Sequence, residues 1–92
     1  MDLIQIFELA SKKKASDVHI VVGKPPIVRI YGVLHELKNE PPVTKINAEK
    51  LIFSILGPKQ KERLIQEKEL DVSFQAKDET RFRVNCHYEK GN

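Results

Sequence analysis

The residues with the clearest potential for binding chemistry are two arginines near the end of the chain, Arg81 and Arg83. They stand two apart in an apolar–polar alternation, and strand residues with that spacing point to the same face. A guanidinium is permanently charged and presents a fork of N–H donors that matches phosphate oxygens. The pair has the chemistry to hold a phosphate-bearing ligand. The alternative is an ordinary solvent-exposed strand face, on which the arginines pair with Asp71 or Glu79.

The rest of the sequence offers no self-contained catalytic site. It has no Gly-x-x-x-x-Gly-Lys-[Ser/Thr] loop to surround phosphates, and segment 23–26 (GKPP) lacks the glycines and the following helix of such a loop. His19, His35 and His87 lie far apart and have no second ligand at metal-binding spacing. No nucleophile, base and orienting group can be assembled. We therefore expect no metal site and no independent enzyme activity in this chain.

Length and composition indicate one small globular domain. The 92 residues are 40% apolar and 32% charged, which is typical of a folded chain and not of a disordered one. Apolar runs of about five residues are far shorter than the ~20 that span a bilayer, so we expect no transmembrane segment. No signal peptide is recognisable at the start. The single cysteine, Cys86, excludes an internal disulfide and suits a reducing cytoplasm.

The net charge of +3 permits a nucleic-acid partner without requiring one. Lys12, Lys13 and Lys14 form the densest basic run, but they end a predicted helix, where cations complement the partial negative charge of the helix terminus. Nucleic-acid surfaces usually carry exposed aromatic side chains among the basic ones. This sequence has no tryptophan, and its few other aromatic residues lie in apolar alternation. We expect no nucleic-acid partner.

Hydrophobic periodicity predicts an α+β domain. The predicted elements are a helix over residues 2–13, strands over 17–22, 27–31 and 33–37, helices over 47–56 and 58–68, and strands over 70–76 and 81–88. Asp2 is the expected cap of the first helix, and Gly57 followed by Pro58 marks the boundary between the later helices. Short turns between strands favour an antiparallel sheet with the helices on one face.

Several other residues receive structural interpretations. Asp17 opens the first strand and is expected to accept backbone hydrogen bonds there. His19 lies among apolar neighbours and is expected to be packed and hydrogen-bonded. Cys86 is expected to fill the core. Leu64 and Ile65 are the expected anchors of the otherwise charged third helix.

Three sequence motifs occur in a fixed order along nearly the whole chain. They are SDVH at residues 16–19 with the following GKPP and the Arg-x-x-Gly of residues 29–32, then ELDVSF at residues 69–74, then RFRVN at residues 81–85. Together they resemble the secretion and type IV pilus ATPases, with the signature S-D-x-H-x-x-x-G-x-P-P-x-x-R-x-x-G-x-L. The later motifs, E-x-D-x-S-F and R-F-R-V-N, are similar to the twitching-motility retraction (PilT-type) branch. Tyr31 departs from the family, which often has aspartate before this glycine.

This resemblance implies a single PAS-like domain over residues 1–92 that precedes a RecA-like core, absent from these residues, in a longer ATPase. The strand-like sequence that runs to the end agrees with that expectation. In the family, ATP binds between the two domains, and arginines on the late strands of the front domain reach the nucleotide phosphates. That role would fall to Arg81 and Arg83, with Arg83 preferred. Arg29, in the Arg-x-x-Gly position, would face the nucleotide or the domain interface.

The implied function is that of the N-terminal domain of a hexameric, ATP-driven motor for pilus retraction and twitching motility, contributing to nucleotide binding and interdomain coupling. ATP and Mg²⁺ are the implied cofactors of the full-length parent, and neither should bind this fragment tightly. The implied partners are its own RecA-like core, neighbouring subunits of a homo-hexamer and an inner-membrane pilus platform protein, in the cytoplasm at the inner-membrane face. The alternatives are a stand-alone PAS-like sensor or adaptor, and the domain of an assembly or type II secretion ATPase.

Overall fold

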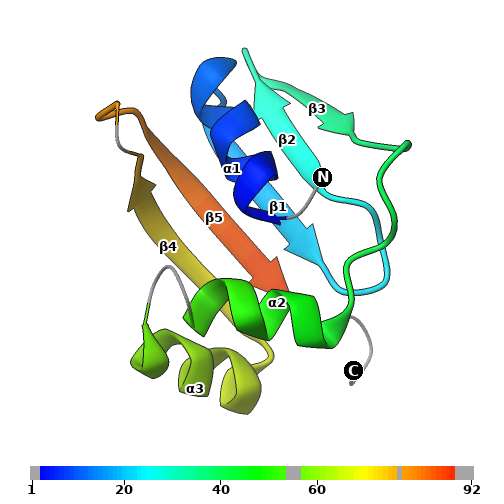
Figure 1. The fold of residues 1–92 in the computed structure, drawn as a ribbon, viewed down its shortest axis with the longest axis vertical. Coiled ribbons are helices and arrows are strands. Elements are labelled where there is room, and N and C mark those ends of the chain that lie inside the picture. Colours follow the sequence, from blue (N-terminus) through cyan, green and yellow to red (C-terminus); the bar gives the residue numbers. More distant parts are fainter. Residues whose placement is uncertain (1–2, 54–56, 77, 89–92) are drawn as a thin grey trace.

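The chain, in a computed structural model that describes residues 3–53, 57–76 and 78–88, follows the predicted order of elements. A helix is followed by three strands, two helices and two strands (Figure 1). The elements are α1 (Leu3–Lys12), β1 (Asp17–Val21), β2 (Ile27–Ile30), β3 (Val33–Glu36), α2 (Lys45–Leu51), α3 (Pro58–Glu67), β4 (Glu69–Gln75) and β5 (Arg81–His87).

The strands form one five-stranded mixed sheet in the order β3-β2-β1-β5-β4. The pairs β1–β2, β2–β3 and β4–β5 are antiparallel, as the short turns between strands predicted. β1 and β5 lie side by side at the centre and run parallel (Figure 1). The expectation of a wholly antiparallel sheet is wrong at this junction. The crossover through α2, α3 and β4 brings the last strand back in the direction of the first.

The core lies between one face of the sheet and the helices, which confirms the α+β prediction. Val18 and Ile20 of β1 and Val84 and Cys86 of β5 alternate toward that face, and each is exposed by 1% or less. The same apolar cluster contains residues from all three helices. α1 contacts β1 and β5, while α3 packs against β4 (Figure 1). The opposite face of the central strands carries the polar residues.

Three phenylalanine rings join α1 to the C-terminal hairpin. The ring centroid of Phe7 lies 5.1 Å from that of Phe74 and 5.5 Å from that of Phe82, and the latter two are 5.4 Å apart. Edge-to-face and tilted pairs of this kind contribute about 0.5–1.5 kcal/mol each beyond their burial. Phe7 and Phe82 are only 4% and 3% exposed. The first helix is thereby fixed over the last two strands.

Individual core predictions divide between right and wrong. Cys86 fills the core as expected, and Leu64 anchors α3 with no exposed surface. Ile65 is 40% exposed, so its predicted anchoring role is wrong. Adjacent helical residues point ~100° apart, and a short helix that rests on one strand buries one of the two. The expected cap at Asp2 and the end of the helix predicted over residues 47–56 lie outside the described residues.

The starts of α2 and α3 are both set by local sequence signals. α2 begins at Lys45, earlier than the predicted start at Asn47, because the hydroxyl of Thr44 accepts a hydrogen bond from the Asn47 N–H at 3.1 Å and caps the helix. The boundary before α3 is confirmed, since Gly57 adopts a φ of 100° and Pro58 is the first helical residue. Among the described helices, none combines the length and apolar character needed to cross a lipid bilayer.

The β2–β3 hairpin turns through Tyr31 and Gly32, which have φ values of 50° and 79°. Positive φ at both central residues is the mark of the type I′ turn, whose twist matches that of the flanking strands. A residue with a Cβ adopts this conformation at a cost of about 1–2 kcal/mol, and asparagine tolerates it better than most. Tyr31 is 87% exposed, so little packing compensates for the strain.

Replacing Tyr31 with asparagine should therefore stabilise the chain by about 0.5–1 kcal/mol and raise Tm by about 4 °C. Urea and thermal unfolding of the variant will measure the change. Tyr31→Phe is the matched control, because phenylalanine keeps the strained side chain and should leave stability unchanged. A Tyr31→Asn variant no more stable than Tyr31→Phe would contradict the assignment of strain to this turn.

Candidate functional site

The sheet face opposite the helices brings together polar residues from β1, β2, β4 and β5. The strand register places Arg29, Asp17 and Arg83 side by side in one row across β2, β1 and β5. The next row holds Ile27, His19, Asn85 and Asp71 on β2, β1, β5 and β4. Arg81 follows Arg83 on the same face of β5, opposite Gln75. The predicted site residues thus share one surface, and the parallel β1–β5 pair unites them.

Asp17 lies at the centre of the row formed by Arg29, Asp17 and Arg83, which is called the arginine row below. Its carboxylate lies 3.4 Å from Nε of Arg29 and 4.0 Å from Nε of Arg83, and it accepts a hydrogen bond from the Ser16 hydroxyl at 2.7 Å. The Asp17 side chain is only 16% exposed. Asp17 was expected to accept hydrogen bonds from backbone N–H groups. Its carboxylate pairs with two arginines instead, because the pairing of β1 with β2 and β5 places an arginine on each side of it.

The backbone beside Asp17 fixes the spacing of the two arginines. The N–H of Ser16 donates to the carbonyl of Arg29, and its carbonyl accepts from the N–H of Arg83, both at 2.9 Å. One residue therefore holds the main chains of β2 and β5 on either side. The guanidinium of Arg29 also donates to the Gly32 carbonyl at 3.1 Å. The row is held by main-chain as well as side-chain contacts.

Arg83 and Arg81 have different partners. Nη2 of Arg83 donates to Oδ2 of Asp71 at 2.5 Å, and this hydrogen bond, reinforced by the carboxylate charge, raises the pKa of Arg83. Its side chain is 64% exposed. Arg81 donates to Oε1 of Gln75 at 3.4 Å. The sequence alternative in which an arginine pairs with Asp71 is confirmed for Arg83, and the phosphate-binding role of both arginines stays a prediction.

Sequence reasoning missed the polar neighbours of this row. Nε2 of His19 is buried and has no hydrogen-bond partner among the described residues, so the hydrogen bond expected for His19 is not made at this atom. Asn85 and His87 continue the face of Arg83 along β5, and Nδ1 of His87 lies 3.4 Å from Oδ1 of Asn85. The two-residue spacing 83, 85, 87 is the signal that would have found them. Within the described ranges, no cluster of three or more His, Cys, Asp or Glu residues is arranged to hold a metal ion.

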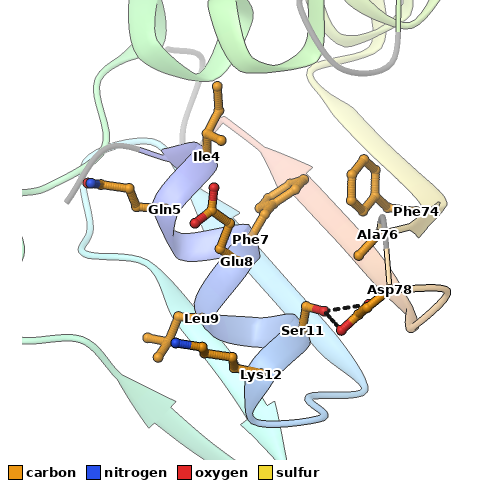
Figure 2. A pocket seen from close by; sticks show the side chains of 10 residues that line it. All are labelled: Ile4, Gln5, Phe7, Glu8, Leu9, Ser11, Lys12, Phe74, Ala76 and Asp78. Atoms are coloured by element: carbon orange, nitrogen blue, oxygen red, sulfur yellow. Dashed lines mark hydrogen bonds between the residues drawn. The ribbon is translucent and has the colours of Figure 1, made fainter.

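A second candidate is an open groove of about 630 Å³ on the helix-covered side, between α1 and the end of β4. Figure 2 shows Phe7 of α1 turned toward Phe74, with Ile4 at the upper end of the groove. At the lower end, Oγ of Ser11 lies 2.9 and 2.8 Å from the two carboxylate oxygens of Asp78. This contact ties α1 to the β4–β5 turn. The groove offers apolar contact and no convergent set of catalytic groups.

Comparison with known proteins links this geometry to one class of ATPases. No protein-family model matches the chain. The chain is similar to the type IV pilus retraction ATPase PilT of Pseudomonas aeruginosa, with 34% identity over 86 residues that make up 94% of this chain and 25% of that protein. Its fold matches the pilus retraction motor PilT solved with bound ADP, at a TM-score of 0.69 and 34% identity over 100% of this chain and 27% of that one.

A second solved structure, that of the Legionella pneumophila ATPase DotB, matches at a TM-score of 0.61 and 28% identity. The match covers 88% of this chain and 22% of DotB. The chain therefore spans about a quarter of the length of the relatives that it matches. The remainder of each relative has no counterpart in these residues.

The Ser11–Asp78 contact predicts a pH dependence of stability. The hydroxyl of Ser11, followed by the hydroxyl and N–H of Thr80, lowers the pKa of Asp78 below its ordinary value of 3.8. A lowered pKa in the folded state gives stabilisation that is complete above the ordinary value and is lost as pH falls through the folded one. Ser11→Ala should therefore flatten the acid decline of the unfolding free energy below about pH 4.

Urea unfolding at a series of pH values will measure this slope for Ser11→Ala and Asp78→Asn. Both variants should show a reduced slope. The reduction should be smaller for Ser11→Ala, because Thr80 still lowers the pKa of Asp78 in that variant, whereas Asp78→Asn removes the titrating group. A Ser11→Ala slope equal to that of the unmodified chain would show that the serine does not set the pKa of Asp78.

Exposure of the arginine row predicts that Arg83 can be changed without unfolding the chain. Its ion pairs lie at the surface, where such pairs contribute about 0–1 kcal/mol, so Arg83→Gln should lower the unfolding free energy by less than about 1 kcal/mol. Phe82→Ala, one residue away, removes a buried ring and should cost about 3–5 kcal/mol. Urea unfolding of the two variants tests the contrast. A loss for Arg83→Gln that approaches that of Phe82→Ala would assign the ion pairs a structural role.

Proposed function

We propose that this chain, which has the sequence and fold of the N-terminal domain of PilT-type secretion ATPases, supplies arginines to the nucleotide phosphates of a hexameric pilus-retraction motor. The observation that carries the proposal is the row formed by Arg29, Asp17 and Arg83 on the open sheet face. Two guanidinium groups remote in sequence are held on one surface by a shared carboxylate.

The charge of this surface suits a phosphate ligand. Three arginines, Arg29, Arg81 and Arg83, lie on this face beside the carboxylates of Asp17 and Asp71, and Glu36 and Glu69 lie toward the other end of the same face. The Arg83 guanidinium is mostly exposed and so has room to turn toward a ligand above the sheet. A fork of fixed donors binds two phosphate oxygens at once, which a lysine ammonium does not do.

The chemistry proposed for these arginines is charge stabilisation during ATP hydrolysis. Charge spreads over the oxygens of the transferring phosphoryl group, and an arginine that neutralises it is worth about 10³–10⁵ in rate in other phosphate-hydrolysing enzymes. The sequence has no phosphate-binding loop, so a RecA-like core in the longer protein would hold ATP and Mg²⁺. An arginine supplied by a neighbouring domain makes turnover depend on the relative position of the two domains. That dependence is the proposed coupling.

The proposed partners follow from the same picture. They are the RecA-like core of the same protein, neighbouring subunits in a homo-hexameric ring and an inner-membrane pilus platform protein, with the assembly in the cytoplasm at the inner-membrane face. The length of the relatives, about four times that of the chain, supports a longer parent. The higher identity to PilT than to DotB favours retraction over other branches of the family.

The groove between α1 and β4 is the observation that would favour a sensor or adaptor instead. Its volume of about 630 Å³ falls in the range of ligand pockets. It is open, however, and the polar contact at its edge, between Ser11 and Asp78, is satisfied within the chain. The arginine row has charge that a ligand can use, and the motor domain is therefore the function that we propose.

The test of the proposal is Arg83→Ala in the full reading frame that contains this domain. ATP turnover should fall at least ~10-fold because charge on the transferring phosphoryl group loses its partner. Arg81→Ala and Arg29→Ala should have smaller effects. Arg63→Ala is the matched control, since Arg63 is an exposed arginine on α3 that pairs with Glu67 at 2.9 Å and is not a member of the row, although it lines the same hollow as Asp71 and Asn85. Unchanged turnover in Arg83→Ala would remove Arg83 from the nucleotide site.

A further inference from the structure

The guanidinium of Arg83 is shared unequally by two carboxylates. Its Nη2 lies 2.5 Å from Oδ2 of Asp71, whereas its Nε lies 4.0 Å from Oδ1 of Asp17. The Asp71 side chain is 45% exposed and that of Asp17 is 16% exposed. The shorter contact is therefore made by the carboxylate with better access to water.

The two carboxylates would respond differently if Arg83 moved away. Asp17 would keep the ion pair with Arg29 at 3.4 Å and the hydrogen bond from the Ser16 hydroxyl at 2.7 Å. Asp71 would exchange its contact for water, and exposed ion pairs of this type add little to stability. Asp17 is thus a fixed part of the row, and Asp71 is a partner that can be replaced at low cost.

We propose that Asp71 is a displaceable positioning residue, which holds Arg83 against the sheet in the absence of ligand and competes with phosphate for its guanidinium. This inference rests on the proposed phosphate-binding function of Arg83. On ligand binding, the N–H···O bond to Asp71 is exchanged for bonds to phosphate oxygens, and no proton is transferred because arginine stays charged throughout. A bound phosphate also repels the Asp71 carboxylate, which drives the two apart.

Competition between Asp71 and the ligand for the Arg83 guanidinium makes ligand affinity depend on the charge of the ligand. A singly charged anion offers the guanidinium about what Asp71 already offers, so it has little advantage. A polyphosphate chain carries several charges and can contact Arg29 and Arg83 together, since both flank Asp17 in the same row. The Arg83–Asp71 pair therefore favours polyphosphate ligands over monoanions. Arg81 donates to the neutral Gln75 instead, so this contact does not favour ligands of higher charge.

The experiment measures binding of inorganic tripolyphosphate to this chain by NMR titration at low ionic strength, where surface charge effects are least screened. Asp71→Asn keeps the shape of the side chain and removes its charge. Glu69→Gln is the matched control, because Glu69 is an exposed carboxylate on the same face of β4, opposite His87, and the change alters net charge equally. Asp71→Asn should bind tripolyphosphate about two- to fivefold more tightly than Glu69→Gln does.

A second readout separates exchange at Arg83 from a general effect of charge. The Nε–Hε signal of Arg83 should move on tripolyphosphate addition, and at a lower ligand concentration in Asp71→Asn. In the Arg83→Gln background, Asp71→Asn should give no advantage over Glu69→Gln, as a double-mutant cycle requires for a direct interaction.

Three outcomes are distinguished by these variants. Tighter binding by Asp71→Asn that depends on Arg83 supports the inference. Equal affinities of Asp71→Asn and Glu69→Gln, with Arg83→Gln weaker than the unmodified chain, would overturn the inference and leave the phosphate role of Arg83 standing. Equal titrations of Arg83→Gln and the unmodified chain would overturn the phosphate role itself and the inference with it.

Discussion

The parallel register of β1 against β5 is the constraint on which both the core and the candidate site depend. On one face it pairs Val18 with Val84 in the apolar cluster, and on the other it sets Asp17 beside Arg83. A slip of one residue would turn the apolar side chains of either strand out of the core. A slip of two residues would preserve the faces but would part Asp17 from Arg83. Packing excludes the first error, and the second is opposed by the Ser16 backbone contacts and the Asp17 ion pairs.

The sheet has two faces with different interactions. The helix-covered face is held by apolar burial and by the ring contacts of Phe7, Phe74 and Phe82, which are insensitive to salt and pH. The opposite face is held by ion pairs that are weak, exposed and exchangeable. This division lets the arginine row change partners without disturbing the core. A surface that must rearrange around a ligand is best placed where few kilocalories of stability depend on it.

The parts of the fold that sequence predicted correctly are those set by neighbouring residues. The strand alternations, the tight turn at Gly32 between the second and third strands, and the Gly57–Pro58 helix boundary are local signals. The parallel β1–β5 pair was missed because its residues are far apart in the chain and no turn connects them. The same omission explains why Asp17 was given a backbone role, since its arginine partners come from two other strands. The start of α2 was misplaced because Thr44 and Asn47 are both capping residues, and only the hydrogen bond between them selects one.

Because Cys86 is buried, the reactivity of its thiol reports on opening of the core. It is the single cysteine of the sequence, it is 1% exposed, and it lies in β5 between Ile20 of β1 and Leu70 of β4. Burial raises the pKa of its thiol to about 12, so the reactive thiolate is almost absent in the closed sheet at neutral pH. Alkylation of this thiol requires the helices to move away from the sheet, because Cys86 lies on the helix-covered face. The alkylation rate therefore measures how often the core opens.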